Sequence, residues 1–340
     1  MDDLFALAPQ VRARALFLIS KWQKEEVSLP LVDRYIDLFK ETISGGKTIR
    51  GLLVTLGFQL NGKKENKDIL DIAAAFEIVH AALLIQDDIM DKSPTRHGKP
   101  SYHYVLGADH FGLSQAMCAG DVGFMLANRI ILDSNFNSTI KNKAASVFAD
   151  IVLKTIIGQI LDVHFTYKEV PKNEDEIGEM YKLKTAQYTV SGPLLIGAIL
   201  AGSSPELLHQ IDGFGKNLGI AFQIKDDILG VFGDEKTVGK SVFSDIREGK
   251  NTFLYVHALE NANSADRKIL TSYYGNDNLT DEQGLIVKDI LKKLSFSYCQ
   301  TILGKYVDAA KGIIPRITSY NEKLSPVFFE LCTYFTERNK

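Results

Sequence analysis

The sequence predicts an all-α protein, folded as a single domain over residues 1–340. Three observations lead to this prediction. Apolar residues recur at helical spacing along most of the chain, no run shows the alternation of a β-strand, and the breaks between periodic segments are short. No stretch has the composition of an interdomain linker, and no internal repeat is found, so one large helical unit accounts best for the pattern.

The clearest helix is predicted over residues 69–91, where apolar or alanine residues recur three or four positions apart. Similar periodicity predicts helices over residues 31–42, 47–60, 113–132, 142–165, 174–201, 205–230, 251–261, 283–294 and 298–314. Residues that favour turns separate these segments at Gly45-Gly46, Asn61-Gly62, Ser93-Pro94, Gly202 to Pro205 and Gly233 to Gly239.

Composition narrows the class of function. Hydrophobic residues make up 45% of the 340, enough for a large buried core. The net charge is -3 and no basic run stands out, which argues against nucleic acid as a partner. The chain starts with acidic residues rather than a signal peptide, and its apolar runs are too short to predict a transmembrane segment. Three scattered cysteines indicate a reduced, cytoplasmic protein.

The most informative stretch is an apolar helix that ends in Asp87, Asp88 and Asp91. Asp87 and Asp91 are four residues apart and therefore share one face of the helix. Like charges repel there, and helix stability does not require them, whereas a divalent cation would neutralise them. Magnesium favours a few carboxylates together with ligand phosphates. Taken alone, the cluster is equally consistent with a solvated helix end.

A second apolar helix closes on Asp226 and Asp227, which follow Phe222 and Gln223. Two acid pairs at the ends of apolar helices predict one cavity lined from both sides. Such a cavity suits metal ions that hold a diphosphate between facing helices.

Basic residues flank both clusters. A glycine pair opens a helix that carries Lys47 and Arg50, and helix starts of this kind bind phosphate. Each basic residue alone could be a solvated charge, but together they supply cations for two diphosphates. The other segments are Arg96-His97-Gly98, Lys184-Thr185, Gly239-Lys240 and Gly249-Lys250.

In this order, from about Gly45 to Lys250, the motifs resemble those of the trans-polyprenyl diphosphate synthases, the family of farnesyl and geranylgeranyl diphosphate synthases. The resemblance implies the all-α isoprenoid synthase fold, a large helical bundle around a central cavity. It also implies a homodimeric prenyltransferase that condenses isopentenyl diphosphate with an allylic diphosphate, head to tail, to a linear polyprenyl diphosphate.

The resemblance assigns roles to individual residues. It implies that about three Mg²⁺ ions bind with the substrate. Their ligands would be Asp87, Asp91 and, less directly, Asp88 on one side, with Asp226 and nearby Asp227 on the other. The allylic diphosphate would contact Arg96, Lys184 and Lys240, and the developing carbocation would lie near Thr185 and Gln223.

Isopentenyl diphosphate would bind Lys47, Arg50 and His80, with His97 beside them. A lone histidine on an apolar helix is more often a satisfied core residue. His80 lies two turns before Asp87 on nearly the same face, which favours the substrate role. Asp162, in a segment that also fits the family pattern, is expected to support a neighbouring residue rather than bind substrate.

Two positions depart from the family pattern. His97 stands where an arginine is usual, which predicts weaker binding of isopentenyl diphosphate because histidine is a pH-dependent cation. Gly230 stands where the second cluster often has a third aspartate, which leaves Asp226 as the expected main ligand there.

Product length is expected to depend on residues one to three turns before Asp87. Ala82 is small and predicts no stop at fifteen carbons, which favours a twenty-carbon product, with twenty-five or more carbons as the alternative. The next floor would be formed by Val79, Ile78 and Phe76. Close helix packing is the other explanation for Ala82. A class I terpene cyclase and a non-catalytic subunit are the rival functions, and both fit the motifs less well.

Overall fold

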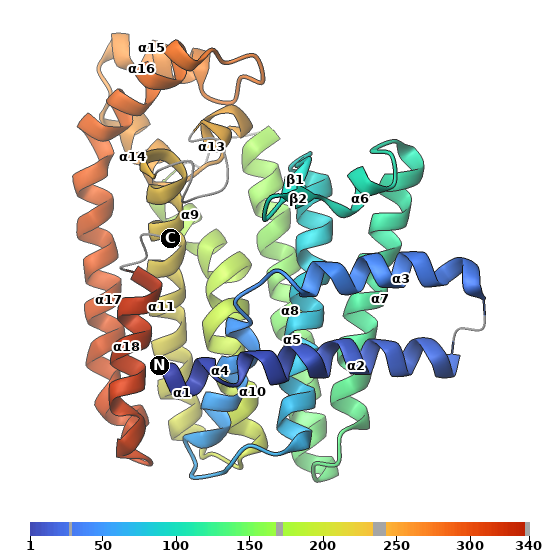
Figure 1. Cartoon of the computed structure of the whole chain (residues 1–340). Helices are drawn as coiled ribbons and strands as arrows, with labels where there is room; N and C mark the ends of the chain where they lie inside the picture. The colour runs from blue at the N-terminus through green and yellow to red at the C-terminus, as the bar shows by residue number, and fades with distance from the viewer. Residues whose placement is uncertain (27–28, 168–172, 234–242, 337–340) are drawn as a thin grey trace. The chain divides into compact units, whose positions relative to one another are not determined.

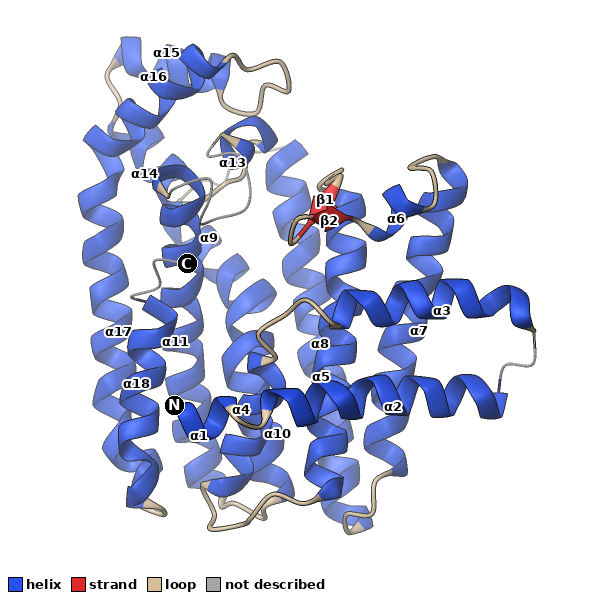
Figure 2. Cartoon of the chain, in the orientation of Figure 1, coloured by secondary structure: helices blue, strands red, loops and turns tan. Residues whose placement is uncertain are grey.

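The computed structural model describes residues 1–26, 29–167, 173–233 and 243–336 (Figure 1). These residues form helices almost throughout, as Figure 2 shows, so the predicted all-α fold is confirmed. The chain divides into two compact units, and the helices α8 (Ser138–Tyr167) and α11 (Pro205–Phe232) contribute residues to both. That the whole chain acts as one domain stays a prediction.

The first unit comprises residues 1–150, 192–208 and 319–322. Besides parts of α8 and α11, its helices are α1 (Asp2–Phe5), α2 (Ala8–Glu26), α3 (Pro30–Ile43), α4 (Ile49–Gln59), α5 (Lys67–Met90), α6 (Tyr102–Val105), α7 (His110–Asp133) and α10 (Gly192–Leu200).

The helix α5 is the centre of the first unit. Asn66 begins it by accepting a hydrogen bond from the Ile69 N–H, 3.0 Å away, which satisfies one donor at the helix start. The helix packs against α2, α4 and α7, and alanines 73–75 are fully buried. Since α5 is covered on several sides, its direction is fixed, and so is the place where its last turn presents Asp87 to Asp91.

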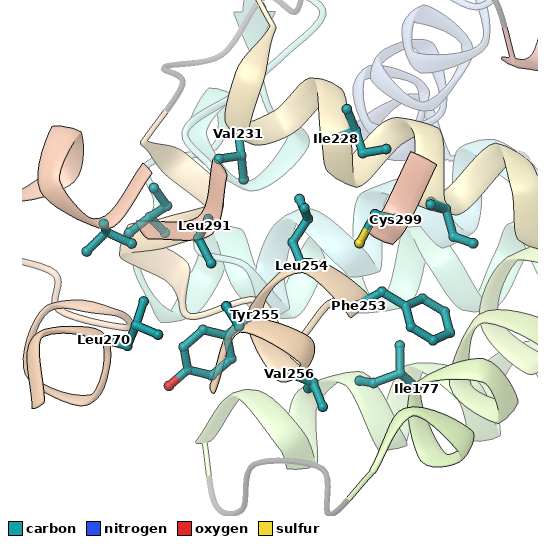
Figure 3. Packing of buried hydrophobic residues seen from close by; sticks show 14 of the residues in the cluster. Ile177, Ile228, Val231, Phe253, Leu254, Tyr255, Val256, Leu270, Leu291 and Cys299 are labelled. Atoms are coloured by element: carbon teal, nitrogen blue, oxygen red, sulfur yellow. The ribbon is translucent and has the colours of Figure 1, made fainter. Parts of the chain in front are cut away.

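The second unit comprises residues 151–191, 209–318 and 323–340. Figure 3 shows part of its core, in which Ile177, Phe253 and Leu254 are packed with Ile228 and Cys299. Besides parts of α8 and α11, its elements are α9 (Glu174–Tyr181), a π-helix η1 (Lys182–Ser191), α13 (Ser244–Glu248), α14 (Phe253–Asn261), α15 (Ser264–Tyr273), α16 (Asp281–Leu291), η2 (Lys292–Phe296), α17 (Ser297–Thr318) and α18 (Ser325–Thr336). The short helix η3 (Glu322–Leu324) lies at the boundary of the two units.

Some elements differ from the sequence prediction. The helix α2 was not predicted, and the segment predicted as one helix over 174–201 is interrupted by the π-helix η1. A two-stranded antiparallel hairpin, β1 (Thr95–Arg96) and β2 (Lys99–Pro100), follows the first acidic cluster.

One described helix, α8, is long and apolar enough to cross a membrane by length and composition alone. A single helix of this kind is weak evidence, and it carries Asp162, which is buried and paired with lysines. Only 33% of its most apolar window is buried, so much of this helix presents apolar side chains outward.

Candidate active site

The first acidic cluster lies at the carboxyl end of α5, where Asp91 is the C-cap residue. A helix carboxyl end carries partial negative charge, so three aspartates there are unfavourable without nearby cations. Arg96 supplies one: its Nε donates to Asp88 Oδ1 at 2.8 Å, and its Nη2 to Asp87 Oδ2 at 3.2 Å. Burial lowers the pKa of Arg96, but the bond and charge of Asp88 outweigh this and raise it. Asp88 is buried and orients Arg96.

The hairpin explains how Arg96 reaches the cluster. His97 and Gly98 form its two-residue turn, with φ of 51° and 75°. Two positive φ angles at these positions fit a type I′ turn, which matches the twist of paired strands. The turn places His97 at the hairpin tip. The side chain is exposed in part, and the loss of solvent on its covered side, together with the charge of Arg96, lowers its pKa.

A small pocket in the first unit brings together His80 and His97, two of the residues predicted to bind isopentenyl diphosphate. Gly46, Glu77, His80 and His97 all line it. Burial and then the charges of Arg50 and Arg96 lower the pKa of His80 well below its usual value, so His80 is neutral at pH 7. Its imidazole therefore offers a hydrogen bond rather than a charge.

Lys47 and Arg50 belong to the turn that leads into α4. Lys47 is exposed, Thr48 is the N-cap residue in the left-handed conformation, and Arg50 is half-buried in the first turn of the helix. The predicted glycine turn opening onto a helix is therefore present.

The second acidic cluster is part of a hydrogen-bonded chain in the second unit. The Thr185 hydroxyl donates to Gln223 Oε1 at 2.7 Å, and Gln223 Nε2 donates to Asp227 Oδ1 at 2.9 Å. The Tyr181 hydroxyl donates to the other oxygen of Asp227. Burial raises the pKa of Asp227 to about 8, although these two hydrogen bonds lower it. Both oxygens of Asp227 are thus engaged in hydrogen bonds.

Lys184 and Lys250 meet at one buried carboxylate. Asp162 Oδ2 lies 2.7 Å from Lys184 Nζ and 3.4 Å from Lys250 Nζ. The expectation that Asp162 supports a neighbouring residue agrees with this geometry. Lys184 and Thr185 lie in the π-helix η1, a rare element that is often found at functional sites.

Gly158 explains how α8 approaches this π-helix. A Cβ atom built at position 158 would lie 2.2 Å from the Lys184 backbone nitrogen, so any larger residue would push the two elements apart. The glycine in the segment that ends at Asp162 therefore serves the close packing that carries Asp162 to Lys184.

Gly230 has an equally specific neighbour. A Cβ at this position would lie 1.9 Å from Asp245 Oδ2, so the carboxylate of Asp245 occupies the space of a side chain there. Asp245 belongs to the short helix α13. A carboxylate from another helix therefore lies beside the position where α11 lacks a third aspartate, and the sequence analysis did not identify it.

The remaining predicted residues are Lys240 and those expected to limit product length. Lys240 lies outside the described residues. Ala82 is fully buried, and a Cβ built at Gly123 of α7 would lie 2.7 Å from its Cβ, so Ala82 lies in the seam between α5 and α7. Phe76 is fully buried with its ring edge-on to Phe148, 5.2 Å between centroids. Whether this region also guides the product stays a prediction.

Sequence reasoning missed Tyr181 and Glu77 as well as Asp245. Glu77 is buried in α5, and its Oε1 accepts a hydrogen bond from the Gly51 N–H at 2.7 Å. An acidic residue within an otherwise apolar helix was the available signal for Glu77, since a buried carboxylate needs a partner. Tyr181 had no comparable signal.

Carboxylates clustered on helices, with Arg96 beside the first cluster and two lysines on Asp162 in the unit that holds the second, define a class of protein that handles diphosphates with a divalent metal. Residues 33–294 match the model of the polyprenyl synthetase family. The chain is 34% identical to a geranylgeranyl diphosphate synthase of Sulfolobus acidocaldarius, covering 87% of this chain and 88% of that protein. It is 31% identical to a geranylfarnesyl diphosphate synthase of Aeropyrum pernix, covering 87% and 92%.

A solved structure agrees with this. Geranylgeranyl pyrophosphate synthase from Corynebacterium glutamicum, in complex with isoprenyl diphosphate and magnesium, superposes with a TM-score of 0.91 at 26% identity, covering 98% of this chain and 99% of that one. The chain therefore belongs to the polyprenyl synthetase family, and the prediction of a trans-prenyltransferase is confirmed. Enzymes of this family act on isopentenyl diphosphate and allylic diphosphates.

Proposed function

We propose that this protein condenses isopentenyl diphosphate with an allylic diphosphate, with Mg²⁺, and that geranylgeranyl diphosphate, with twenty carbons, is its main product. The observation that carries the proposal is the cluster of Asp87, Asp88 and Asp91 at the carboxyl end of α5, with Arg96 bound against it. The relatives include enzymes named for a twenty-carbon product and for a twenty-five-carbon product, so a twenty-five-carbon product is the alternative.

The residues present fit a magnesium site. Asp87 and Asp91 are both half-buried oxygen donors four residues apart, and the partial negative charge of the helix end adds to their attraction for a cation. In the second unit Asp226, with Asp245 and Asp227 close to α11, offers a similar oxygen-rich set. Bound magnesium would neutralise charge that grows on the departing diphosphate. That one diphosphate engages both clusters is a prediction from the sequence.

The basic side chains of each unit would share this task. Arg96 in the first unit and Lys184 in the second are already held by Asp88 and Asp162, so their direction is set before substrate binds. Lys250 shares Asp162 and would add a further charge. Preset cations need little reorganisation as the carbon–oxygen bond breaks, which favours the charge-separated transition state.

Thr185 and Gln223 would act on the allylic carbon. Because the Thr185 hydroxyl donates its proton to Gln223, its oxygen is left as an acceptor whose lone pairs suit a neighbouring positive charge. Lys47, Arg50 and neutral His80 of the first unit would hold isopentenyl diphosphate so that its double bond attacks. The departed diphosphate would take the proton that is finally lost.

The test is direct. The purified chain is incubated with isopentenyl diphosphate, Mg²⁺ and allylic starters of increasing length, and the lipid products are sized by chromatography. Consumption of isopentenyl diphosphate with accumulation of a twenty-carbon diphosphate supports the proposal. Cyclic products, or no consumption by folded protein, would contradict it. Removal of Mg²⁺ by a chelator should abolish the reaction, and adding it back should restore it.

The same assay tests product length. Ala82→Phe should shorten the product if this position borders the growing tail. Gly123→Phe is the matched variant for comparison, because it adds the same ring to the α5–α7 seam from the other helix. A folded Ala82→Phe enzyme with an unaltered product distribution would limit Ala82 to helix packing.

We also propose a homodimer, which works in the cytoplasm. The three cysteines are free thiols, in keeping with a reducing compartment. Each unit presents apolar side chains to solvent, Met117 and Met125 of α7 in the first and Leu153 and Ile160 of α8 in the second, all more than half exposed. Paired with a second copy, such faces would lose this exposure.

Met125→Glu and Ile160→Glu should shift the mass measured by light scattering from dimer to monomer, and a monomeric wild type would contradict the proposal.

A further inference from the structure

The turn between α3 and α4 is held from outside by Arg12, a residue of α2. Arg12 Nη2 donates to the Gly46 carbonyl oxygen at 2.7 Å and to Thr48 Oγ1 at 3.3 Å. These acceptors flank Lys47. Both bonds come from Nη2, one nitrogen of a rigid, planar and permanently charged group, so a single side chain holds the backbone on each side of Lys47.

This turn needs to be held. Thr48 has φ of 60°, in the left-handed region, which is unfavourable for a β-branched residue, and it is 4% exposed. As the N-cap residue of α4, Thr48 would ordinarily turn its hydroxyl to an N–H of the first helical turn, but it makes no such bond. Its hydroxyl accepts from Arg12 instead. The contact therefore stabilises a conformation that Thr48 disfavours.

Glu77 fixes the other side of the same turn. Its carboxylate accepts from the Gly51 N–H at 2.7 Å and is 6% exposed. Burial raises the pKa of Glu77, while the Gly51 hydrogen bond and the charges of Arg50 and Arg12 lower it. Arg12 from α2 and Glu77 from α5 thus hold the two ends of the segment from Gly46 to Gly51, and Gly46 and Glu77 both line the pocket with His80.

We propose that Arg12 is a positioning residue for isopentenyl diphosphate: it shapes the Gly46–Thr48 backbone so that Lys47 and Arg50 present their charges to the same diphosphate. This inference rests on the proposed function. It assigns a role in substrate binding to α2, a helix without any residue of the predicted site. Arg12 would affect the binding of isopentenyl diphosphate and leave the allylic substrate, which the two aspartate clusters would hold, unaffected.

Arg14 offers a matched control two residues along the same helix. Its Nη2 lies 2.9 Å from Asp71 Oδ2, so it also ties α2 to α5 through an arginine, but its hydrogen bonds go to Asp71 rather than to the turn. Arg12→Ala and Arg14→Ala each remove one arginine that anchors α2. Only the first removes the contacts to Gly46 and Thr48.

The experiment measures binding of isopentenyl diphosphate alone by calorimetry, and then both Michaelis constants. Isopentenyl diphosphate without an allylic partner undergoes no condensation, so its affinity is read without turnover. Arg12→Ala should weaken this affinity and raise the corresponding Michaelis constant by about tenfold or more, since bonds to a charged group are lost. kcat and the allylic Michaelis constant should stay within about twofold of wild type. Arg14→Ala should bind isopentenyl diphosphate as wild type does.

Equal weakening of both substrates by Arg12→Ala, or equal effects of the two arginine variants, would overturn the inference. If Arg12→Ala does not fold, Arg12→Lys keeps the positive charge but replaces the long planar guanidinium with a shorter, flexible ammonium, and should still weaken isopentenyl diphosphate binding several-fold. A folded Arg12→Lys enzyme with wild-type affinity would also overturn it. A wild-type chain that consumes no isopentenyl diphosphate would instead refute the proposed function, so the two failures are distinguishable.

Discussion

The guanidinium of Arg96 lies against the buried carboxylate of Asp88, with Nε 2.8 Å from Oδ1, and extends to Asp87. The middle residue of the first acidic cluster therefore serves the arginine, while its neighbours at 87 and 91 share the face expected to bind metal. The cluster combines a predicted site for a metal with an internal ion pair that sets the arginine beside it.

Asp88→Asn should separate these two roles. The amide keeps the shape of the side chain but loses its charge, so the half-buried Arg96 is left with a weaker partner, at a cost of about 2 kcal/mol in the free energy of unfolding. The Michaelis constant for the allylic diphosphate should rise because Arg96 is no longer held. Chemical denaturation and steady-state kinetics measure the two effects. If Asp88→Asn weakens only the affinity for Mg²⁺, the main role of Asp88 is to bind the metal, and its proposed role in holding Arg96 is wrong.

Asp226→Ala should lower kcat by about a hundredfold or more, since it removes the main proposed metal ligand of the second cluster. Asp227→Asn is the variant to compare with it. Asp227 is hydrogen-bonded to Tyr181 and Gln223, so its replacement should affect catalysis through the position of Gln223. Raised Mg²⁺ should partly restore Asp226→Ala but not Asp227→Asn. Near-normal turnover of Asp226→Ala would refute its placement as a ligand.

Gly230→Ala should be poorly tolerated because the new methyl group would meet Asp245 Oδ2. We expect the free energy of unfolding to fall by about 1–3 kcal/mol, together with weaker Mg²⁺ binding as Asp245 is displaced. Gly304→Ala is the control: position 304 is also helical, and nothing lies within 4 Å of a Cβ there. That change should stabilise the protein by about 0.5–1 kcal/mol. Similar effects of both changes would mean that Asp245 moves away freely.

His97→Arg should lower the Michaelis constant for isopentenyl diphosphate, by roughly threefold to tenfold at neutral pH. The pKa of His97 lies below its usual value, so the imidazole is neutral at pH 7 and gains its charge only as the pH falls below about 6.5. The wild-type constant should therefore decrease toward acidic pH, relative to that of His97→Arg, whose guanidinium stays charged. Identical constants and identical pH profiles for the two enzymes would remove His97 from the site.

The parts of the site that are local in sequence could be predicted. Asp87 and Asp91 share a face because of helix geometry alone, and the glycines before Lys47 mark a helix start wherever the segment packs. The contacts that hold these residues were not predictable from local patterns. Tyr181 meets Asp227 across 46 residues, Gly51 meets Glu77 across 26, and Arg12 meets Gly46 across 34. Such pairs depend on how the helices pack against one another, and sequence periodicity does not predict that packing.

The fold shows the same division. The helix α5 was predicted to within two residues at its start, because its apolar residues recur at clear helical spacing. The helix α2 was missed, since only Val11, Ala15, Ile19 and Gln23 are buried, a narrow stripe among polar and charged residues. The π-helix was predicted as ordinary helix because π-helices are rare and occur as short inserts within α-helices, so a helical pattern favours the α form.

That π-helix has a consequence for how this chain can vary. Each residue of an α-helix turns the chain by about 100°, so the loss of one residue between Lys182 and Ser191 would redirect every side chain on one side of the cut relative to the other. Lys184 would then leave Asp162, or α10 would leave its groove on α4. Point substitutions can be tried in this segment one at a time, whereas its length is fixed, and natural variants of this enzyme should differ here in residue type and never in residue number.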